Sequence, residues 1–147
     1  MESFQLDGKR IVVTGAASGI GRAIAIRFAH AGAEVILLDL NADSANEVVA
    51  EINSQTPSRA SCLASDISED SSVATAFSQI AATGGLDVLV NSAGIAHVGS
   101  ILTTTPLEFD RLYRINVRGI YLTMPHSSSQ QVIRVPCGLP DRSTPAM

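Results

Sequence analysis

Four short apolar runs recur along the chain, and more polar segments of helical periodicity separate them. The runs cover residues 10–14, 34–38, 60–64 and 87–90. The second run reads EVILL and is almost continuously apolar, which is typical of a strand buried on both faces. We therefore expect four β-strands in one buried sheet.

The segments that follow these runs carry apolar residues at helical spacing. The expected helices cover residues 18–31, 42–54, 69–82 and 106–124. Gly32 is a C-terminal stop for the first helix, Asn41 is an N-cap for the second, and Pro106 suits the first turn of the last. Strands that alternate with crossover helices predict an α/β fold, a doubly wound parallel sheet with strand order 3-2-1-4.

The character of the sequence changes after Met124. Residues 125–147 hold four of the six prolines and show no helical period. Val132–Val135 can form one short strand, and the rest is expected to be an irregular C-terminal tail. The predicted organisation is one domain over residues 1–124, followed by this tail over residues 125–147.

Composition narrows the range of functions. The 147 residues are 46% hydrophobic and 16% charged, with a formal net charge of −4 and no basic block. This balance argues against nucleic acid and membrane as partners, and no apolar run approaches membrane-spanning length. Cys62 and Cys137 form no motif and no signal-peptide pattern is present, which favours a cytoplasmic location. His30, His97 and His126 lack metal-ligand spacing, so no metal site is expected.

A glycine-rich turn, TGAASGIG at residues 14–21, joins the first strand to the first helix. Backbone N–H groups and the helix dipole at such a junction favour an anion, typically a pyrophosphate. Gly15 can take the positive φ of a tight turn, Gly19 leaves room for a phosphate, and Gly21 lets the helix lie close to the strand. The alternative is a flexible turn without a ligand.

Asp39 closes the second strand, 18 residues after Gly21. A carboxylate there can accept hydrogen bonds from both ribose hydroxyls of an adenine nucleotide, and it repels the 2′-phosphate of NADP. No Arg or Lys lies in the glycine turn or just after Asp39 to offset that repulsion. Charge-assisted hydrogen bonds contribute about 1.5–3 kcal/mol, so NAD is the expected cofactor in preference to NADP. The alternative is an Asp that caps the next helix.

The glycine spacing resembles the T-G-x-x-x-G-x-G loop of the short-chain dehydrogenase/reductase family. Three further motifs follow in the family's order, namely Asp66-Ile67 after the third strand, Asn91-Ser92-Ala93-Gly94 (similar to N-N-A-G) after the fourth, and Asn116-Val117-Arg118-Gly119 (similar to N-V-x-G) in the last helix. The resemblance covers about residues 6–124. It implies a Rossmann-like fold and hydride transfer between a nicotinamide and an alcohol or carbonyl.

The resemblance also implies roles for single residues. Asp66 would hold the adenine amino group, small residues such as Ala93 would let the backbone approach the nicotinamide ribose, and Ile115 would lie near the nicotinamide. Asn116 would be buried, break the local helix pattern and hold a water that relays protons, a supporting catalytic role. Asn is otherwise unfavourable within a helix, which favours a functional or kink-forming role. An ordinary turn or a solvated surface position is the alternative for each motif. The full expected cofactor set is Gly15, Ser18, Gly19, Ile20, Gly21, Asp39, Leu40, Asp66, Ile67, Asn91, Ala93, Gly94 and Ile115.

The residues that the family uses for proton transfer are missing from this sequence. Family chemistry needs a Ser, then a Tyr, with a Lys four residues after the Tyr. The lone lysine is Lys9, and the two tyrosines, Tyr113 and Tyr121, are followed four residues later by Val117 and Pro125. No serine after residue 124 suits the catalytic position. The chain is therefore expected to be catalytically incomplete and the sheet incomplete, through truncation, an internal deletion or a frameshift.

Three hypotheses about function remain open from the sequence. The chain is an NAD-dependent short-chain dehydrogenase by descent, a non-catalytic NAD-binding module, or an aberrant product without a function. The implied partners are NAD(H) and, for a complete enzyme, a small alcohol or carbonyl, and intact family members form homo-oligomers through two helices, of which only residues 106–124 are expected here. An exposed apolar edge at Val88–Val90 predicts a marginally stable, aggregation-prone protein.

Overall fold

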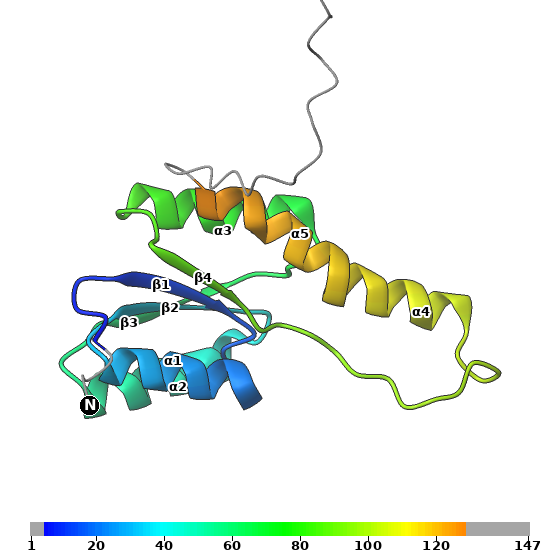
Figure 1. Cartoon of the computed structure of the whole chain (residues 1–147), viewed down its shortest axis with the longest axis horizontal. Coiled ribbons are helices and arrows are strands. Elements are labelled where there is room, and N and C mark those ends of the chain that lie inside the picture. Colours follow the sequence, from blue (N-terminus) through cyan, green and yellow to red (C-terminus); the bar gives the residue numbers. More distant parts are fainter. Residues whose placement is uncertain (1–4, 129–147) are drawn as a thin grey trace, which may run out of the picture.

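A four-stranded parallel sheet with helices on both faces forms the frame of the chain in the computed structural model, which describes residues 5–128 (Figure 1). The strand order is β3-β2-β1-β4, so the predicted order 3-2-1-4 is confirmed. The strands are β1 (Arg10–Thr14), β2 (Glu34–Asp39), β3 (Ala60–Ala64) and β4 (Val88–Asn91). Each begins within one residue of its predicted start.

The first three helices also form where the sequence predicts them. They are α1 (Gly19–His30), α2 (Ala42–Gln55) and α3 (Asp70–Ala82). The Asn41 side chain accepts a hydrogen bond from the Ser44 N–H at 3.1 Å, which confirms it as the N-cap of α2. Gly32 follows α1 with a φ of +95°, a conformation that ends helices and that other residues rarely adopt.

The last helix departs from the prediction of one continuous helix over residues 106–124. Its parts are α4 (Pro106–Tyr113), the π-helical turn η1 (Arg114–Arg118), α5 (Gly119–Thr123) and the 3₁₀ turn η2 (Met124–Ser128). The π-helical turn contains Asn116, whose side chain bonds to a distant backbone segment. Helical turns run to Ser128, past the predicted end at Met124, while the possible strand Val132–Val135 lies outside the described residues.

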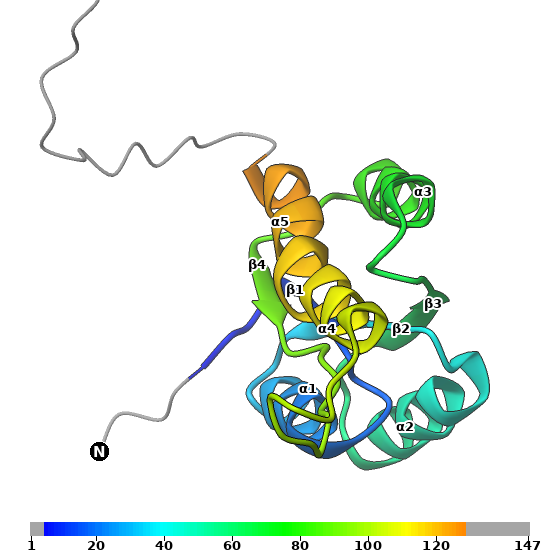
Figure 2. The same ribbon diagram turned by 90° about the vertical axis from the view of Figure 1, so that its right-hand side faces the viewer.

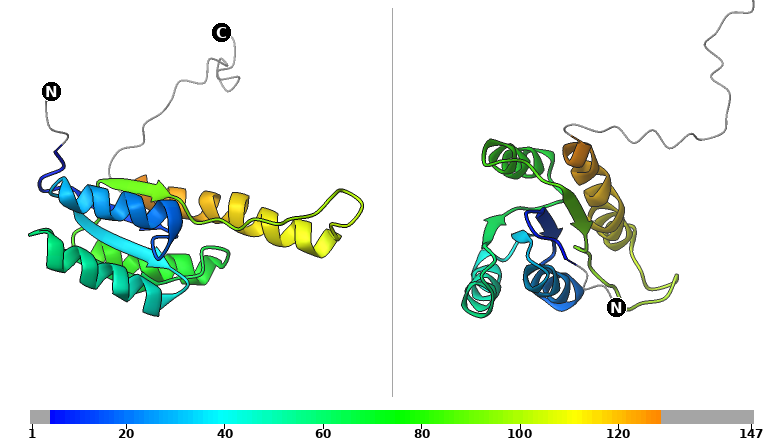
Figure 3. Two further views of the ribbon diagram at one scale, coloured as in Figure 1. Left: turned by 90° about the horizontal axis from the view of Figure 1, so that it is seen from below. Right: turned by 60° about the vertical axis from the view of Figure 1, so that its left-hand side comes forward.

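Alternate residues of the strands fill two separate cores, as expected for a sheet covered on both faces. Ile11 and Val13 lie in the core under α1 and α2. Val12, between them in the sequence, lies in the opposite core with Phe77 of α3. Figures 2 and 3 show α1 and α2 on one side of the sheet, with α3 and the α4–α5 segment on the other. The doubly wound architecture is therefore confirmed.

Strand β4 is an edge strand within residues 5–128, where it pairs with β1. Val88 at its start is 37% exposed. A strand edge with exposed apolar side chains favours association with other chains. The predicted tendency to aggregate is consistent with this edge and stays a prediction.

Candidate functional site

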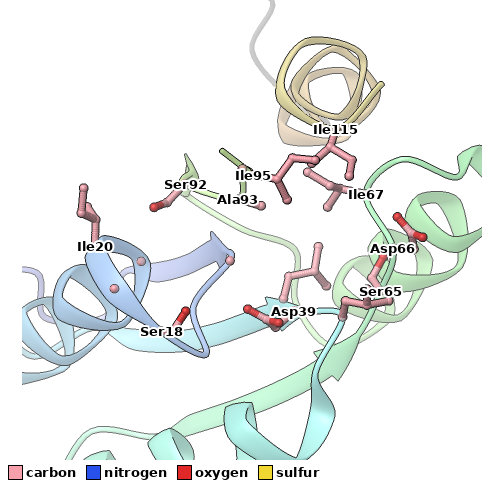
Figure 4. Close-up of a pocket in the computed structure, with 16 residues that line it drawn as sticks. Ser18, Ile20, Asp39, Ser65, Asp66, Ile67, Ser92, Ala93, Ile95 and Ile115 are labelled. Atoms are coloured by element: carbon pink, nitrogen blue, oxygen red, sulfur yellow. The ribbon is translucent and has the colours of Figure 1, made fainter. Parts of the chain in front are cut away.

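A pocket of about 420 Å³ opens at the carboxyl ends of the four strands (Figure 4). Ligands bind at this end of open parallel sheets, near the point where the strand order reverses between β1 and β4. The segments after all four strands contribute to the pocket, together with the first turn of α1 and one residue of η1. The lining residues are Gly15, Ser18, Gly19, Ile20, Gly21, Leu38, Asp39, Leu40, Ser65, Asp66, Ile67, Ser92, Ala93, Gly94, Ile95 and Ile115.

The glycine turn is held by two close backbone approaches. Gly15 has a φ of +66°, and a Cβ built on it would lie 2.6 Å from the Cα of Ala93. A Cβ on Gly21 would overlap the carbonyl oxygen of Gly15. Both positions therefore require glycine, as the sequence predicts, because the first turn of α1 and the loop after β4 pack against the same turn.

The N-terminus of α1 faces the pocket and is suited to an anion. Ser18 is the N-cap, yet within the described residues its side chain makes no capping hydrogen bond, and the first turn of α1 carries no acidic residue. A Cβ on Gly19 would meet no atom of these residues within 4 Å, so the space beside the turn is open. Uncapped N–H groups beside open space fit the diphosphate of a dinucleotide.

Asp39 stands at the rim of the pocket and is fixed from two sides. Its Oδ2 accepts a hydrogen bond from the Ala17 N–H at 2.9 Å, and its Oδ1 accepts one from the Asn41 N–H at 2.9 Å. The first bond ties the end of β2 to the glycine turn, a contact that the sequence did not predict. Each carboxylate oxygen has a further lone pair, so the group can still accept hydrogen bonds from a ligand.

Asp66 lines the pocket and also shapes the turn between β3 and α3. Its Oδ1 accepts hydrogen bonds from the Ser68 N–H at 2.9 Å and from the Ser68 hydroxyl at 2.7 Å. The Asp66 N–H donates to the Ser72 hydroxyl at 2.9 Å. Asp66 is thus a turn residue, the alternative drawn from the sequence, and its place in the pocket leaves a second role open.

The loop after β4 is fastened to β1 and to α5. The Thr14 hydroxyl oxygen accepts hydrogen bonds from the N–H groups of Ser92 and Ala93, both at 3.1 Å. The Thr123 hydroxyl donates to Oδ1 of Asn91 at 2.8 Å. Asn91 is the expected cofactor residue that does not line the pocket. Its side chain links β4 to α5, and its place in the cofactor set stays a prediction.

Asn116 holds the same loop from the opposite side. Its Oδ1 accepts a hydrogen bond from the Ile95 N–H, and its Nδ2 donates to the Ile95 carbonyl, both at 2.8 Å. A Cβ on Gly94 would lie 3.2 Å from the same Oδ1, so a small residue suits that position. Asn116 is therefore not a solvated surface residue. Its role in a proton relay stays a prediction.

Apolar side chains gather along one part of the pocket wall. Figure 4 shows Ile67, Ile95 and Ile115 close together, with Asp66 beside Ile67, while Asp39 and Ser18 lie apart from this group. Every expected cofactor residue except Asn91 lines the pocket. The sequence reasoning missed Leu38, Ser65, Ser92 and Ile95 as lining residues. The rule that ligands bind beyond the carboxyl ends of parallel strands would have found Ser65 and Ser92, which directly follow β3 and β4.

The tyrosine and histidine side chains of the described part of the chain lie outside the pocket. Tyr113 and Tyr121 are 54% and 69% exposed and do not line it. His97 shares a hydrogen bond of 3.2 Å with Thr104, and the ring of His126 stacks on Phe77 with 5.0 Å between centroids. Among residues 5–128, no group of His, Cys, Asp and Glu side chains could hold a metal ion.

Cys62 of β3 is a partly buried free cysteine. Burial raises the pKa of the Cys62 thiol, which donates a hydrogen bond to Oδ1 of Asn46 at 3.1 Å. A raised pKa keeps this thiol protonated and unreactive near neutral pH.

Between residues 5 and 128, none of the helices has both the length and the apolar character needed to cross a bilayer.

A doubly wound parallel sheet, a glycine turn at a helix N-terminus and an acidic residue at the end of β2 together define a Rossmann-like α/β domain, with an arrangement typical of dinucleotide sites. The sequence profile of the family described as short chain dehydrogenase matches residues 9–133. The chain therefore belongs to the short-chain dehydrogenase family. The match runs to residue 133, past residue 124, where the resemblance was expected to end.

Individual relatives agree with this assignment. The chain is 41% identical over 127 residues to a short-chain dehydrogenase/reductase of Armillaria gallica, covering 85% of this chain and 49% of the relative. It is 42% identical over 117 residues to the 7alpha-hydroxysteroid dehydrogenase of Escherichia coli, covering 79% and 45%. The crystal structure of a dehydrogenase/reductase from Sinorhizobium meliloti 1021 superposes with a TM-score of 0.80 at 39% identity, covering 86% and 50%. The chain thus spans about half the length of these relatives.

Proposed function

We propose that this chain binds NAD(H) in the pocket at the carboxyl ends of the strands. Family membership implies a nicotinamide cofactor, either NAD or NADP. The observation that carries the choice is the place of Asp39, whose carboxylate stands at the rim, fixed by the N–H groups of Ala17 and Asn41. From this position it can accept hydrogen bonds from the hydroxyls of an adenosine ribose.

The charges around the rim support NAD over NADP. A 2′-phosphate would bring two negative charges close to the Asp39 carboxylate, and repulsion in a partly enclosed pocket is weakly screened. The basic residue nearest the glycine turn in sequence, Arg22, forms an ion pair with Glu51 of α2. Its guanidinium is therefore engaged elsewhere and does not neutralise the rim.

The remaining lining residues suit the other parts of a dinucleotide. The uncapped first turn of α1 would bind the diphosphate, and Asp66 with Ile67 would bound the adenine. The apolar side chains of Ile95 and Ile115 would hold the nicotinamide and exclude water from one face of the ring. When bound, the nicotinamide supplies or accepts hydride, and the residues of this chain bind and orient it.

For the 147 residues themselves the proposal is binding and not turnover, because the sequence contains no Tyr followed four residues later by Lys. Hydride transfer between the nicotinamide and a small alcohol or carbonyl is proposed for a protein that combines this domain with those groups. The proposal places the protein in the cytoplasm, in keeping with a free, protonated Cys62.

The test is a titration of the purified chain with NADH and with NADPH, followed by nicotinamide fluorescence and by calorimetry. We expect one site per chain and an NADH affinity about ten- to a hundredfold higher than that for NADPH. Absence of saturable NADH binding would overturn the proposal, and equal affinities would overturn the preference for NAD. In the same samples, NADH should not be consumed by a panel of aldehydes and ketones. Steady consumption would contradict a binding-only role.

A further inference from the structure

The guanidinium of Arg118 joins the π-helical turn η1 to the turn between β3 and α3, which carries Asp66 and Ile67. Nη1 of Arg118 donates to the Ser68 carbonyl at 2.8 Å, and Nη2 donates to Oδ1 of Asp70 at 2.6 Å. The Ser68 carbonyl belongs to the turn between β3 and α3, and Asp70 is the first residue of α3. Arg118 therefore fixes this turn to the end of the π-helical segment.

Hydrogen bonds and packing within the turn connect Arg118 to the pocket-lining residues Asp66 and Ile67. Ser68 donates both its N–H and its hydroxyl to Oδ1 of Asp66, so the residue that Arg118 holds is bonded twice to an acidic residue in the pocket. Ile67 is 7% exposed and packs in one core with Ile115. A Cβ on Gly119 would lie 2.7 Å from Cδ1 of Ile67, which shows how closely the turn and the helix approach.

A neighbouring arginine shows what is particular to Arg118. Arg114, one turn earlier, forms an ion pair with Glu69 at 3.5 Å, with side chains 53% and 55% exposed. Exposed pairs of this kind contribute little. Arg118 makes an exposed ion pair as well, but in addition it donates a charge-assisted hydrogen bond to a backbone carbonyl, which fixes the path of the turn.

We propose that Arg118 is a positioning residue for the adenine end of the pocket, acting through the Ser68 carbonyl on Asp66 and Ile67 (Figure 4 shows the last two). The inference rests on the proposed binding of an adenine dinucleotide. Without the guanidinium, the turn would lose its hydrogen bond to the helical segment and become less ordered. Binding of the adenine would then have to order Asp66 and Ile67. Such ordering lowers affinity without removing any direct contact with the ligand.

The binding test compares Arg118→Ala with Arg114→Ala, a matched variant that removes an arginine one helical turn away and its ion pair to Glu69, the N-cap of α3. The ligands are NADH and ADP, which shares the adenine, ribose and diphosphate. We expect Arg118→Ala to raise the Kd by about tenfold and by the same factor for both ligands. Arg114→Ala should stay within about twofold of the parent chain. Equal effects of the two variants, or a loss confined to NADH, would overturn the assignment.

A second readout separates this inference from the proposed function. In the ligand-free chain, the Asp66 N–H donates to the Ser72 hydroxyl of α3 and the Ser68 N–H donates to the Asp66 carboxylate, so hydrogen exchange at these two amides reports the order of the turn. Arg118→Ala should speed exchange of these two amides and leave that of Leu37 in β2 unchanged. Unchanged exchange at Asp66 and Ser68 would refute the role of Arg118 even if NADH binding fails in the parent chain.

The conservative variant Arg118→Lys covers the case in which the alanine variant loses its fold. A lysine keeps the charge beside Asp70 but lacks the fork that reaches the carboxylate and the Ser68 carbonyl together. We expect Arg118→Lys to bind ADP more weakly than the parent chain, by less than about tenfold. Full recovery by lysine would show that charge alone matters and would contradict a positioning role through Ser68.

Discussion

The carboxylate of Asp39 and the backbone N–H of Ala17 are joined by a hydrogen bond of 2.9 Å. The residue that is expected to bind the ribose therefore also holds the glycine turn. A second bond, from the Asn41 N–H, fixes the carboxylate against α2. The rim and the turn are thus aligned before a ligand arrives, which lowers the ordering cost of binding.

Replacement of Asp39 should therefore lower the affinity for NADH itself, in addition to changing the preference for NADH over NADPH. In Asp39→Ala the ribose loses its acceptor and the Ala17 N–H loses its partner, so we expect the Kd for NADH to rise by about ten- to a hundredfold. NADPH should not reach the affinity that the parent chain has for NADH, because the turn has lost its anchor. Fluorescence titrations of both nucleotides measure this.

The control for Asp39 is Asp43→Ala, which removes an exposed carboxylate from the first turn of α2 outside the pocket. Its Kd for NADH should match that of the parent chain. If Asp39→Ala binds NADPH as tightly as the parent binds NADH, the role of Asp39 as an anchor of the turn is wrong.

Alanine substitutions at two glycines of the same turn, Gly21 and Gly19, should affect stability and NADH binding differently. The Cβ of Gly21→Ala would overlap the Gly15 carbonyl oxygen, so backbone must shift, and we expect a loss of about 1–3 kcal/mol in the free energy of unfolding. The Cβ of Gly19→Ala would enter open space beside α1 at a φ of +56°, which costs about 1–2 kcal/mol.

Ligand binding distinguishes these two variants better than stability does. Gly19→Ala should remain folded and lose at least tenfold in NADH affinity, since its methyl group occupies the space left for the diphosphate. Urea unfolding and NADH titration on both variants are the measurements. Normal NADH affinity in folded Gly19→Ala would argue that the ligand does not approach the N-terminus of α1.

Local sequence patterns were sufficient to predict the strands of the sheet and the caps of the helices. Burial on both faces makes β2 a continuous apolar run, and the cap at Asn41 depends on a residue only three positions away. The contacts that shape the site are between residues far apart in the chain. Asn116 bonds to Ile95, 21 positions earlier, and that bond accompanies the π-helical turn that interrupts the predicted helix. No local pattern specifies such a partner.

The pocket itself was largely predictable because its residues follow strand ends. In a parallel sheet these ends meet at one edge, so Gly15, Asp39 and Asp66 had to converge once the strand order was known. The sequence could not separate a residue that lines this pocket from one that supports it. Asn91 follows the same pattern, yet its side chain turns to Thr123.

Arg10 fastens the opposite end of the sheet, and its loss should destabilise the fold without altering the pocket. Its guanidinium donates to Glu34 at 3.1 Å, to the Thr83 hydroxyl at 2.6 Å, and to the carbonyls of Ile80 and Gly85 at 3.0 and 2.6 Å. The side chain is 14% exposed. We expect Arg10→Met to lower the free energy of unfolding by about 2–4 kcal/mol, because these acceptors lose their shared donor.

The adjacent Lys9 provides the control for Arg10. Lys9 lies 3.7 Å from Asp87 with its side chain 54% exposed, so Lys9→Met should change the free energy of unfolding by less than about 1 kcal/mol. Urea unfolding measures both variants. The NADH affinity of folded Arg10→Met should equal that of the parent chain. A drop in affinity at temperatures where the variant is folded would contradict the separation of the two ends of the sheet.

The N-terminus of α4 should loosen in acid through Glu108. The backbone N–H and the hydroxyl of Thr105 donate to this carboxylate at 2.8 Å, and with His97 nearby they hold the pKa of Glu108 below its ordinary value of 4.5. A lowered pKa means that the charged form is favoured in the folded state. The capping contribution is therefore fully present above the ordinary pKa and is lost as the pH falls through the lower, folded value.

The chemical shift of the Thr105 backbone N–H reports this titration directly, because that group donates to the Glu108 carboxylate. We expect a single transition with its midpoint below 4.5, and its absence in Glu108→Gln. Thr105→Ala removes the hydroxyl donor and keeps the backbone donor, so its midpoint should move up and stay below the ordinary value. A midpoint at or above that value in the parent chain would show that the capping box does not form in solution.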